Sequence, residues 1–100
     1  MMPIVIVDDS GEDAALARRV LEQCKILNPV QILKSGADCI SYFKSSSHET
    51  GTLPCLVLLD LVMSPISGVD VLRYLSHLPA SKDSIIVMLS GIQDFNIVRE

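Results

Sequence analysis

Two short apolar runs, Ile4-Val5-Ile6-Val7-Asp8-Asp9 and Leu56-Val57-Leu58-Leu59-Asp60, each end in carboxylates. Continuous apolar runs are typical of parallel strands that are buried on both faces of a sheet. Because the carboxyl ends of parallel strands meet at one edge, ligands of such sheets bind beyond that edge. The two runs therefore predict an α/β protein in which three acidic side chains converge.

The rest of the chain alternates between helical and strand patterns. Ser10 is a typical helix N-cap, and apolar residues at helical spacing predict a helix from about 11 to 27, which Asn28-Pro29 ends. Strands that alternate with amphipathic helices form a parallel sheet with right-handed crossovers. The other expected elements are strands at 30–33 and 85–89, helices after Gly36 and Gly68, and a helix that opens at Gln93.

Composition limits the class of protein. The 100 residues are 49% hydrophobic, which is enough for one packed domain, and the net charge of −4 without a Lys/Arg cluster argues against nucleic-acid binding. No apolar stretch approaches the roughly 20 residues that cross a bilayer. The cysteines are odd in number and widely spaced, which predicts buried free thiols and a cytoplasmic location. They are Cys24, Cys39 and Cys55.

The acidic residues suggest phosphoryl chemistry assisted by a metal. Magnesium prefers oxygen ligands, which Asp8 or Asp9 together with Asp60 could supply. A carboxylate can attack phosphorus to form an aspartyl phosphate, and a metal offsets the repulsion between the two anions. Ser90, at the end of the strand 85–89, could hydrogen-bond a phosphoryl oxygen. Each residue alone has an ordinary role in a turn or a helix cap, so the joint pattern is what favours a site.

At this point the chain resembles the receiver domain of two-component response regulators. The matching segments are spread over nearly the whole chain at family-like separations. The loop at 45–54 is similar to that of the receivers associated with bacterial phytochromes. The segments are Ile4-Val5-Ile6-Val7-Asp8-Asp9-Ser10, Leu58-Leu59-Asp60-Leu61-Val62-Met63, Gly68 and Val87-Met88-Leu89-Ser90-Gly91.

The resemblance implies a flavodoxin-like, doubly wound parallel sheet of strand order 2-1-3-4-5. It implies that Asp60 is the phosphoacceptor, that Asp8, Asp9, Asp60 and the backbone carbonyl of Val62 hold Mg²⁺, and that Ser90 is the switch hydroxyl. A sensor histidine kinase, a phosphotransfer protein or a small phosphodonor would supply the phosphoryl group. A downstream output protein would read the switched face, without direct contact with nucleic acid or membrane.

The chain departs from the family in two places. Ser64 stands where the family usually has proline, which falls at Pro65 instead. The chain ends at Glu100, before the fifth strand, its terminal lysine and the last helix. We therefore expect a single receiver domain over 1–100 that is incomplete at its C-terminus. The strand 85–89 would then be an uncovered sheet edge, and a dimer through that side is a candidate assembly.

We expect a phosphoacceptor that at most catalyses its own phosphorylation and dephosphorylation. Two other functions compete with this interpretation. An aspartyl-nucleophile hydrolase, similar to haloacid-dehalogenase-like enzymes, needs an acid two residues after the nucleophile, and Val62 cannot supply one. A degenerate receiver that only binds a partner would need no phosphoryl chemistry. The joint presence of Asp8, Asp9, Asp60 and Ser90 argues against it, whereas the missing lysine argues for it.

Overall fold

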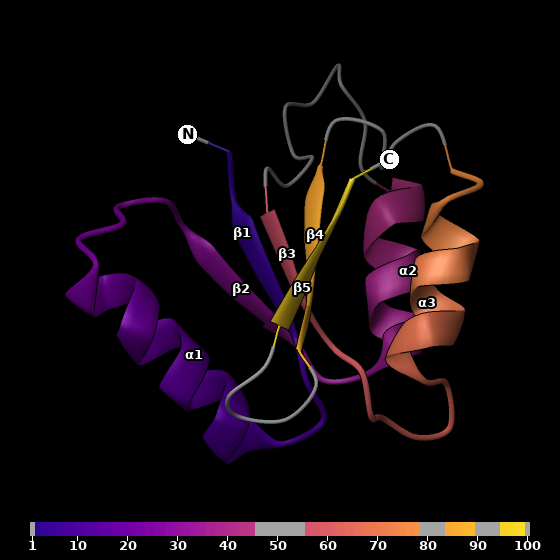
Figure 1. Ribbon diagram of the computed structural model, residues 1–100, viewed down its shortest axis with the longest axis horizontal. Coiled ribbons are helices and arrows are strands. Elements are labelled where there is room, and N and C mark those ends of the chain that lie inside the picture. Colours follow the sequence, from indigo (N-terminus) through magenta and orange to yellow (C-terminus); the bar gives the residue numbers. More distant parts are fainter. Residues whose placement is uncertain (1, 46–55, 79–83, 90–94, 100) are drawn as a thin grey trace.

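A computed structural model describes residues 2–45, 56–78, 84–89 and 95–99, with only the backbone described for 95–99. Its strands form one sheet in the order β2-β1-β3-β4-β5 (Figure 1). The first four strands run parallel, which confirms the α/β class and the order 2-1-3-4. The elements are β1 (Ile4–Val7), α1 (Gly11–Gln23), β2 (Val30–Leu33), α2 (Gly36–Ser45), β3 (Leu56–Asp60), α3 (Gly68–Leu75), β4 (Ile85–Leu89) and β5 (Phe95–Arg99).

Helices cover the two faces of the sheet unequally. α2 and α3 lie together on one face, where Phe43 and Leu75 pack against fully buried strand residues such as Val57 and Ile86. α1 lies on the other face and packs mainly on β1 and β2 through Ala14 and Leu21. None of the described helices combines the length and hydrophobicity that a bilayer-spanning segment requires.

The end of the chain differs from the sequence-based expectation. We expected a helix from Gln93 and an uncovered edge at β4, and both expectations are wrong. Residues 95–99 form β5, which pairs antiparallel with β4 along its whole length, from Ile85 opposite Arg99 to Leu89 opposite Phe95. A parallel return needs a crossover of about a dozen residues, whereas only 90–94 separate the two strands. The antiparallel return satisfies the backbone groups of β4 that a bare edge would leave unpaired.

The helix α1 is also shorter than expected, because a backbone cap ends it before Asn28-Pro29. Lys25 adopts a left-handed φ of 60°. Its amide donates to the Glu22 carbonyl at 3.0 Å, and the Ile26 amide donates to the Leu21 carbonyl at 3.1 Å. This pair of bonds is a Schellman motif, which usually has glycine at the left-handed position. Leu27, expected on the buried face of the helix, is instead 81% exposed.

The cysteines are only partly as expected. Cys24 and Cys39 are both free thiols, but Cys24 is exposed and only Cys39 is buried. Burial raises the pKa of the Cys39 thiol to about 12, so this side chain behaves as an unreactive apolar group. Cys55 lies outside the described residues.

The contact between α2 and α3 predicts the effect of adding one methyl group. A Cβ at Gly36, the first residue of α2, would lie 2.6 Å from Cγ2 of the fully buried Val71 and 3.2 Å from Cβ of Ile66. Both atoms belong to stiff, β-branched side chains. We therefore expect Gly36→Ala to lower the free energy of unfolding by about 1–3 kcal/mol, measured by urea denaturation.

Gly11→Ala is the matched control, because Gly11 is the first residue of α1 and a Cβ added there would meet nothing within 4 Å. Alanine there should leave stability unchanged or raise it by roughly 0.5 kcal/mol. Equal stabilities of the two variants would contradict the tight α2–α3 contact.

Candidate functional site

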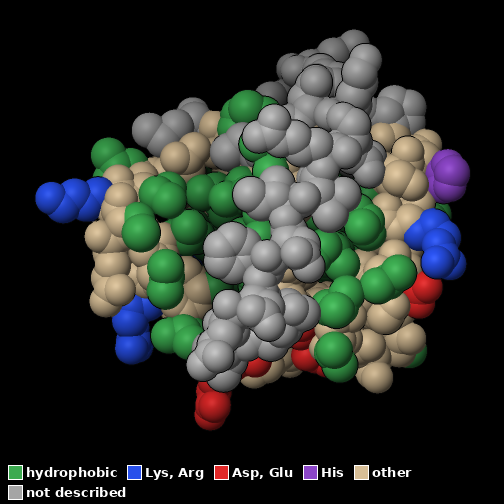
Figure 2. Space-filling view, in the orientation of Figure 1, with side chains coloured by type: hydrophobic (Ala, Val, Ile, Leu, Met, Phe, Trp, Pro, Cys, Tyr) green, Lys and Arg blue, Asp and Glu red, His purple; other side chains and the backbone are tan. Residues whose placement is uncertain are grey.

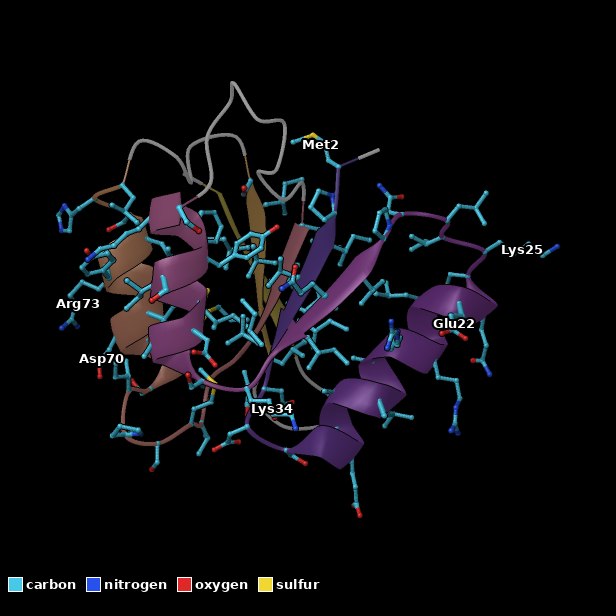
Figure 3. The ribbon with its side chains drawn as sticks, turned by 180° about the vertical axis from the view of Figure 1, so that it is seen from behind. Met2, Glu22, Lys25, Lys34, Asp70 and Arg73 are labelled. Carbon is cyan, nitrogen blue, oxygen red and sulfur yellow. The ribbon has the colours of Figure 1, made fainter. Side chains whose placement is uncertain are left out.

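Three carboxylates meet at the carboxyl edge of the sheet. One oxygen from each of Asp8, Asp9 and Asp60 lies within 4.8 Å of the others. The parallel register of β1 and β3 causes this convergence, since Val7 pairs with Leu59 and the acids follow directly in both strands. Figure 3 shows the same edge from behind, with the labelled Lys34 after the end of β2. The structure therefore brings together the three acids that the sequence singled out.

Asp8 is the buried member of the cluster and is only 5% exposed. Its amide donates to the Leu33 carbonyl at 3.0 Å, which extends the β1–β2 ladder by one residue. Its Oδ1 accepts a hydrogen bond from the Ser10 amide at 2.9 Å. Burial raises the pKa of the Asp8 carboxyl to about 6, the Ser10 bond opposes that rise, and the charge of Asp60 adds to it. The carboxylate is therefore held where its negative charge is poorly solvated.

Asp60 is the last residue of β3 and is partly accessible. Its Oδ1 accepts a hydrogen bond from the Val62 amide at 3.2 Å. The loop after it is fixed at both ends, because the Leu61 amide donates to the Leu89 carbonyl at 2.9 Å and the Gly68 amide donates to the Leu61 carbonyl at 3.0 Å. A Cβ at Gly68 would collide with the Asp60 backbone carbonyl. Glycine is thus required for the close approach of α3 to the end of β3.

Two predicted site groups are not tested by this geometry. Ser90 lies outside the described residues. The amide of Val62 faces Asp60 and its side chain is 75% exposed, but the ligand role of its carbonyl stays a prediction. Sequence reasoning missed Asp13, which lies on the first turn of α1 and lines a groove together with Asp8 and Asp60. The available sequence signal was that Leu16 and Val20 follow Asp13 at one and two helical turns, which places the three residues on one face of α1.

The donor set fits a hard divalent cation. All three side chains offer carboxylate oxygens, and such oxygens at this spacing suit magnesium or manganese better than a soft metal. The repulsion between the clustered charges and the burial of Asp8 both favour a bound cation. The described acids can therefore hold a metal without any rearrangement of the strands.

Comparison with known proteins identifies related chains. No protein-family model matches the chain. The response regulator Rcp1 of Synechocystis sp. is 30% identical over 88 residues, which are 87% of this chain and 60% of the relative. A protein-glutamate methylesterase/protein-glutamine glutaminase of Myxococcus xanthus is also 30% identical over 88 residues, covering 88% of this chain but 24% of the relative. The chain thus spans less than two thirds of each of these relatives.

Solved structures agree with this match. The bacteriophytochrome response regulator AtBRR superposes with a TM-score of 0.81 at 27% identity, over 93% of this chain and 69% of that one. The chain belongs to the response regulator receiver domains. The Mn²⁺-bound form of Rcp1 superposes on this receiver domain with a TM-score of 0.77 at 26% identity, over 94% of this chain and 68% of that one. The likeness to AtBRR confirms the resemblance to the phytochrome-associated receivers.

The burial of Asp8 predicts that replacing its carboxyl group stabilises the folded protein, and that this effect depends on pH. Because the folded-state pKa is raised from 3.8 to about 6, the folded protein binds the extra proton more tightly than the unfolded chain. The metal-free receiver domain should therefore lose stability as the pH rises through this window. We expect Asp8→Asn to be more stable than wild type by on the order of 1–2 kcal/mol at pH 7.5, and equal to it near pH 4. Thermal unfolding in a chelating buffer measures both.

Glu22→Gln is a suitable control, because Glu22 lies on α1 away from the acidic cluster (Figure 3). It removes one negative charge and should not show this pH-dependent difference. Addition of Mg²⁺ should raise the unfolding temperatures of wild type and of Glu22→Gln. It should raise the unfolding temperature of Asp8→Asn much less. If Asp8→Asn stabilises the protein equally at pH 4 and pH 7.5, the raised pKa of the Asp8 carboxyl is contradicted.

Proposed function

We propose that this receiver domain is the phosphoacceptor signalling module of a two-component system. A phosphoryl group would pass to Asp60 from a histidine kinase, a phosphotransfer protein or a small phosphodonor, with Mg²⁺ bound at the acidic cluster. The observation that carries the proposal is the convergence of Asp8, Asp9 and Asp60 at one strand edge. The family relationship supports the same role.

Asp60 is the acid best suited to be the nucleophile. Asp8 is buried and accepts a bond from the Ser10 amide, whereas Asp60 is partly accessible. One oxygen of Asp60 accepts a hydrogen bond from the Val62 amide, which holds the carboxylate in place for attack. Asp8 and Asp9 lie beside it as ligands for the cation, without having to take part in bond making.

The transfer would balance as a substitution at phosphorus. An oxygen of Asp60 forms the new O–P bond while the bond from phosphorus to the donor, such as the nitrogen of a phosphohistidine, breaks. The electron pair leaves with the donor nitrogen. The bound cation would offset the repulsion between the carboxylate and the phosphoryl oxygens.

The expected consequence is a change of the partner-binding face. Asp60 pairs in register with Leu89 at the end of β4, and the Leu61 amide binds the Leu89 carbonyl. Strand pairing and this hydrogen bond therefore connect the acceptor Asp60 to the end of β4. We propose that Ser90, which follows Leu89 in the chain, turns towards the phosphoryl group and shifts the balance between two packings of this region. An output protein would read that shift.

The proposal predicts that Asp60 is essential for the response to a phosphoryl mimic. Titration with Mg²⁺ and then beryllofluoride, followed by amide shifts in NMR, should give saturable changes around Asp9 and Asp60. Asp60→Asn should retain the fold but lose the beryllofluoride response. Glu22→Gln should behave as wild type, because it lies outside the cluster.

Two outcomes would contradict the proposal in different ways. Magnesium shifts without a beryllofluoride response in wild type would mean a metal site that lacks a working switch. No response to either would favour a degenerate receiver that acts only as a protein-interaction module.

A further inference from the structure

Three helices begin at the carboxyl edge of the sheet with the same local pattern. Each of α1, α2 and α3 starts directly after a serine whose hydroxyl oxygen accepts a hydrogen bond from the amide of an aspartate three residues later. The pairs are Ser10 with Asp13 at 3.3 Å, Ser35 with Asp38 at 3.0 Å, and Ser67 with Asp70 at 3.2 Å. Such serines cap the helices, and the acids suit the helix dipole. Figure 2 shows the acidic side chains of the visible face in its lower half, the end at which these helices begin in Figure 1.

The carboxylates of the three aspartates have different surroundings. Oδ2 of Asp70 accepts a hydrogen bond from the Ser67 hydroxyl at 3.1 Å. In the described part of the chain, the Asp13 carboxylate has neither a hydrogen-bond donor nor a basic partner. Burial is the main cause that raises the pKa of the Asp8 carboxyl, and the charge of Asp13 adds to the rise after that of Asp60, whereas Asp38 and Asp70 do not contribute. Asp13 is therefore the first-turn acid that acts on the acidic cluster.

Asp13 is held in a fixed position relative to Asp8. The Ser10 amide donates to Oδ1 of Asp8 at 2.9 Å, and the Ser10 hydroxyl oxygen accepts from the Asp13 amide. The next residue, Ala14, is 1% exposed and packs with Ile4 and Ile6 of β1, so the first turn of α1 cannot rotate away from the strand. All of these contacts lie within residues 4–14, so the position of Asp13 does not depend on what packs elsewhere on the sheet.

Asp13 lies outside the group of direct metal ligands. Among the described residues, the acids with oxygens within 4.8 Å of one another are Asp8, Asp9 and Asp60. Magnesium usually binds one or two carboxylates and keeps several water ligands. Those waters donate hydrogen bonds, and acceptors beyond the inner shell orient them and strengthen metal binding. A free carboxylate fixed beside the ligands is suited to be such an acceptor.

We propose that Asp13 accepts a hydrogen bond from a water ligand of the bound Mg²⁺, and so acts as a positioning residue for the cation without contacting it directly. This inference rests on the proposed function, because it requires a divalent cation at the acidic cluster. It deepens that function by assigning a role to an acid outside the cluster. The negative charge of Asp13 would also attract the cation through its water shell.

The test compares Asp13→Asn with Asp38→Asn. Both aspartates are exposed, follow a capping serine and occupy the first turn of a helix, so both variants lose the same charge and the same helix-dipole interaction. Calorimetric titration of the full chain with Mg²⁺ should show that Asp13→Asn binds about three- to tenfold more weakly than wild type. Asp38→Asn should bind Mg²⁺ less than about twofold more weakly. In a chelator the two variants should unfold at similar temperatures.

Cobalt(III) hexaammine separates contact through a water from direct ligation. Its ammine ligands do not exchange, so it binds only through the N–H groups that it presents, much as a hydrated cation presents its waters. We expect this ion to shift the Asp13 amide of wild type in NMR spectra. Asp13→Asn should weaken its binding by at least the same factor as that of Mg²⁺. The wild-type measurement keeps the test valid even if a variant fails to fold.

Three results would overturn the proposal. Equal Mg²⁺ affinities of Asp13→Asn and Asp38→Asn would mean that only net charge matters. A loss of Mg²⁺ affinity in Asp13→Asn without a loss of hexaammine affinity would make Asp13 a direct ligand. No shift of the Asp13 amide by hexaammine in wild type would exclude the contact. Absence of Mg²⁺ binding by wild type would contradict the proposed function as well, whereas normal Mg²⁺ binding by Asp13→Asn would leave phosphoryl acceptance by Asp60 unaffected.

Discussion

The parallel pairing of β1 with β3 is the constraint on which the rest of the structure depends. It places Val7 beside Leu59, so that Asp8, Asp9 and Asp60 emerge together from the sheet. Three carboxylates within 4.8 Å repel one another, and Asp8 is also deprived of water. The sheet holds them there because shifting either strand would expose fully buried residues such as Val5 and Val57. Core packing thus maintains an electrostatically unfavourable site that a cation relieves.

The same core explains how a local event at Asp60 could act at a distance. Asp60 is joined to the end of β4 by strand register and by the bond between Leu61 and Leu89. It is joined to α3 by the contact with Gly68, at which no side chain fits. A change of charge at Asp60 therefore bears on both β4 and α3. Such rigid connections favour a switch between discrete packings over a gradual deformation.

Much of this architecture could be predicted from local sequence, because apolar runs that end in acids encode both a buried strand and its functional end. The predictions failed where a non-local or backbone effect decided the outcome. The left-handed conformation of Lys25 ended α1 early without a glycine to signal it. The uncovered edge at 85–89 was expected, but its antiparallel pairing with 95–99 is a contact between strands, which the local pattern after Gln93 does not reveal.

The acidic cluster was predictable for the same reason as the strands, whereas the groove beside it was not. Leu16 and Val20 have ordinary spacing for a buried helix face, yet the structure leaves them 44% and 49% exposed. Asp13 is likewise typical of a first helical turn, where an acid suits the helix dipole, and only the structure shows that it lines a groove with Asp8 and Asp60. The exposure of Leu16 and Val20 therefore depends on how α1 packs on the sheet, and not on the sequence of the helix alone.

The central claim is that Asp60 accepts a phosphoryl group in a metal-dependent reaction. Intact-mass spectrometry after incubation with acetyl phosphate tests it most directly, with peptide mapping to locate the modified residue. The account predicts one added phosphoryl group on Asp60 in the presence of Mg²⁺, and none in excess chelator or in Asp60→Asn. An unmodified wild-type chain in Mg²⁺, or a phosphoryl group on another residue, would contradict it.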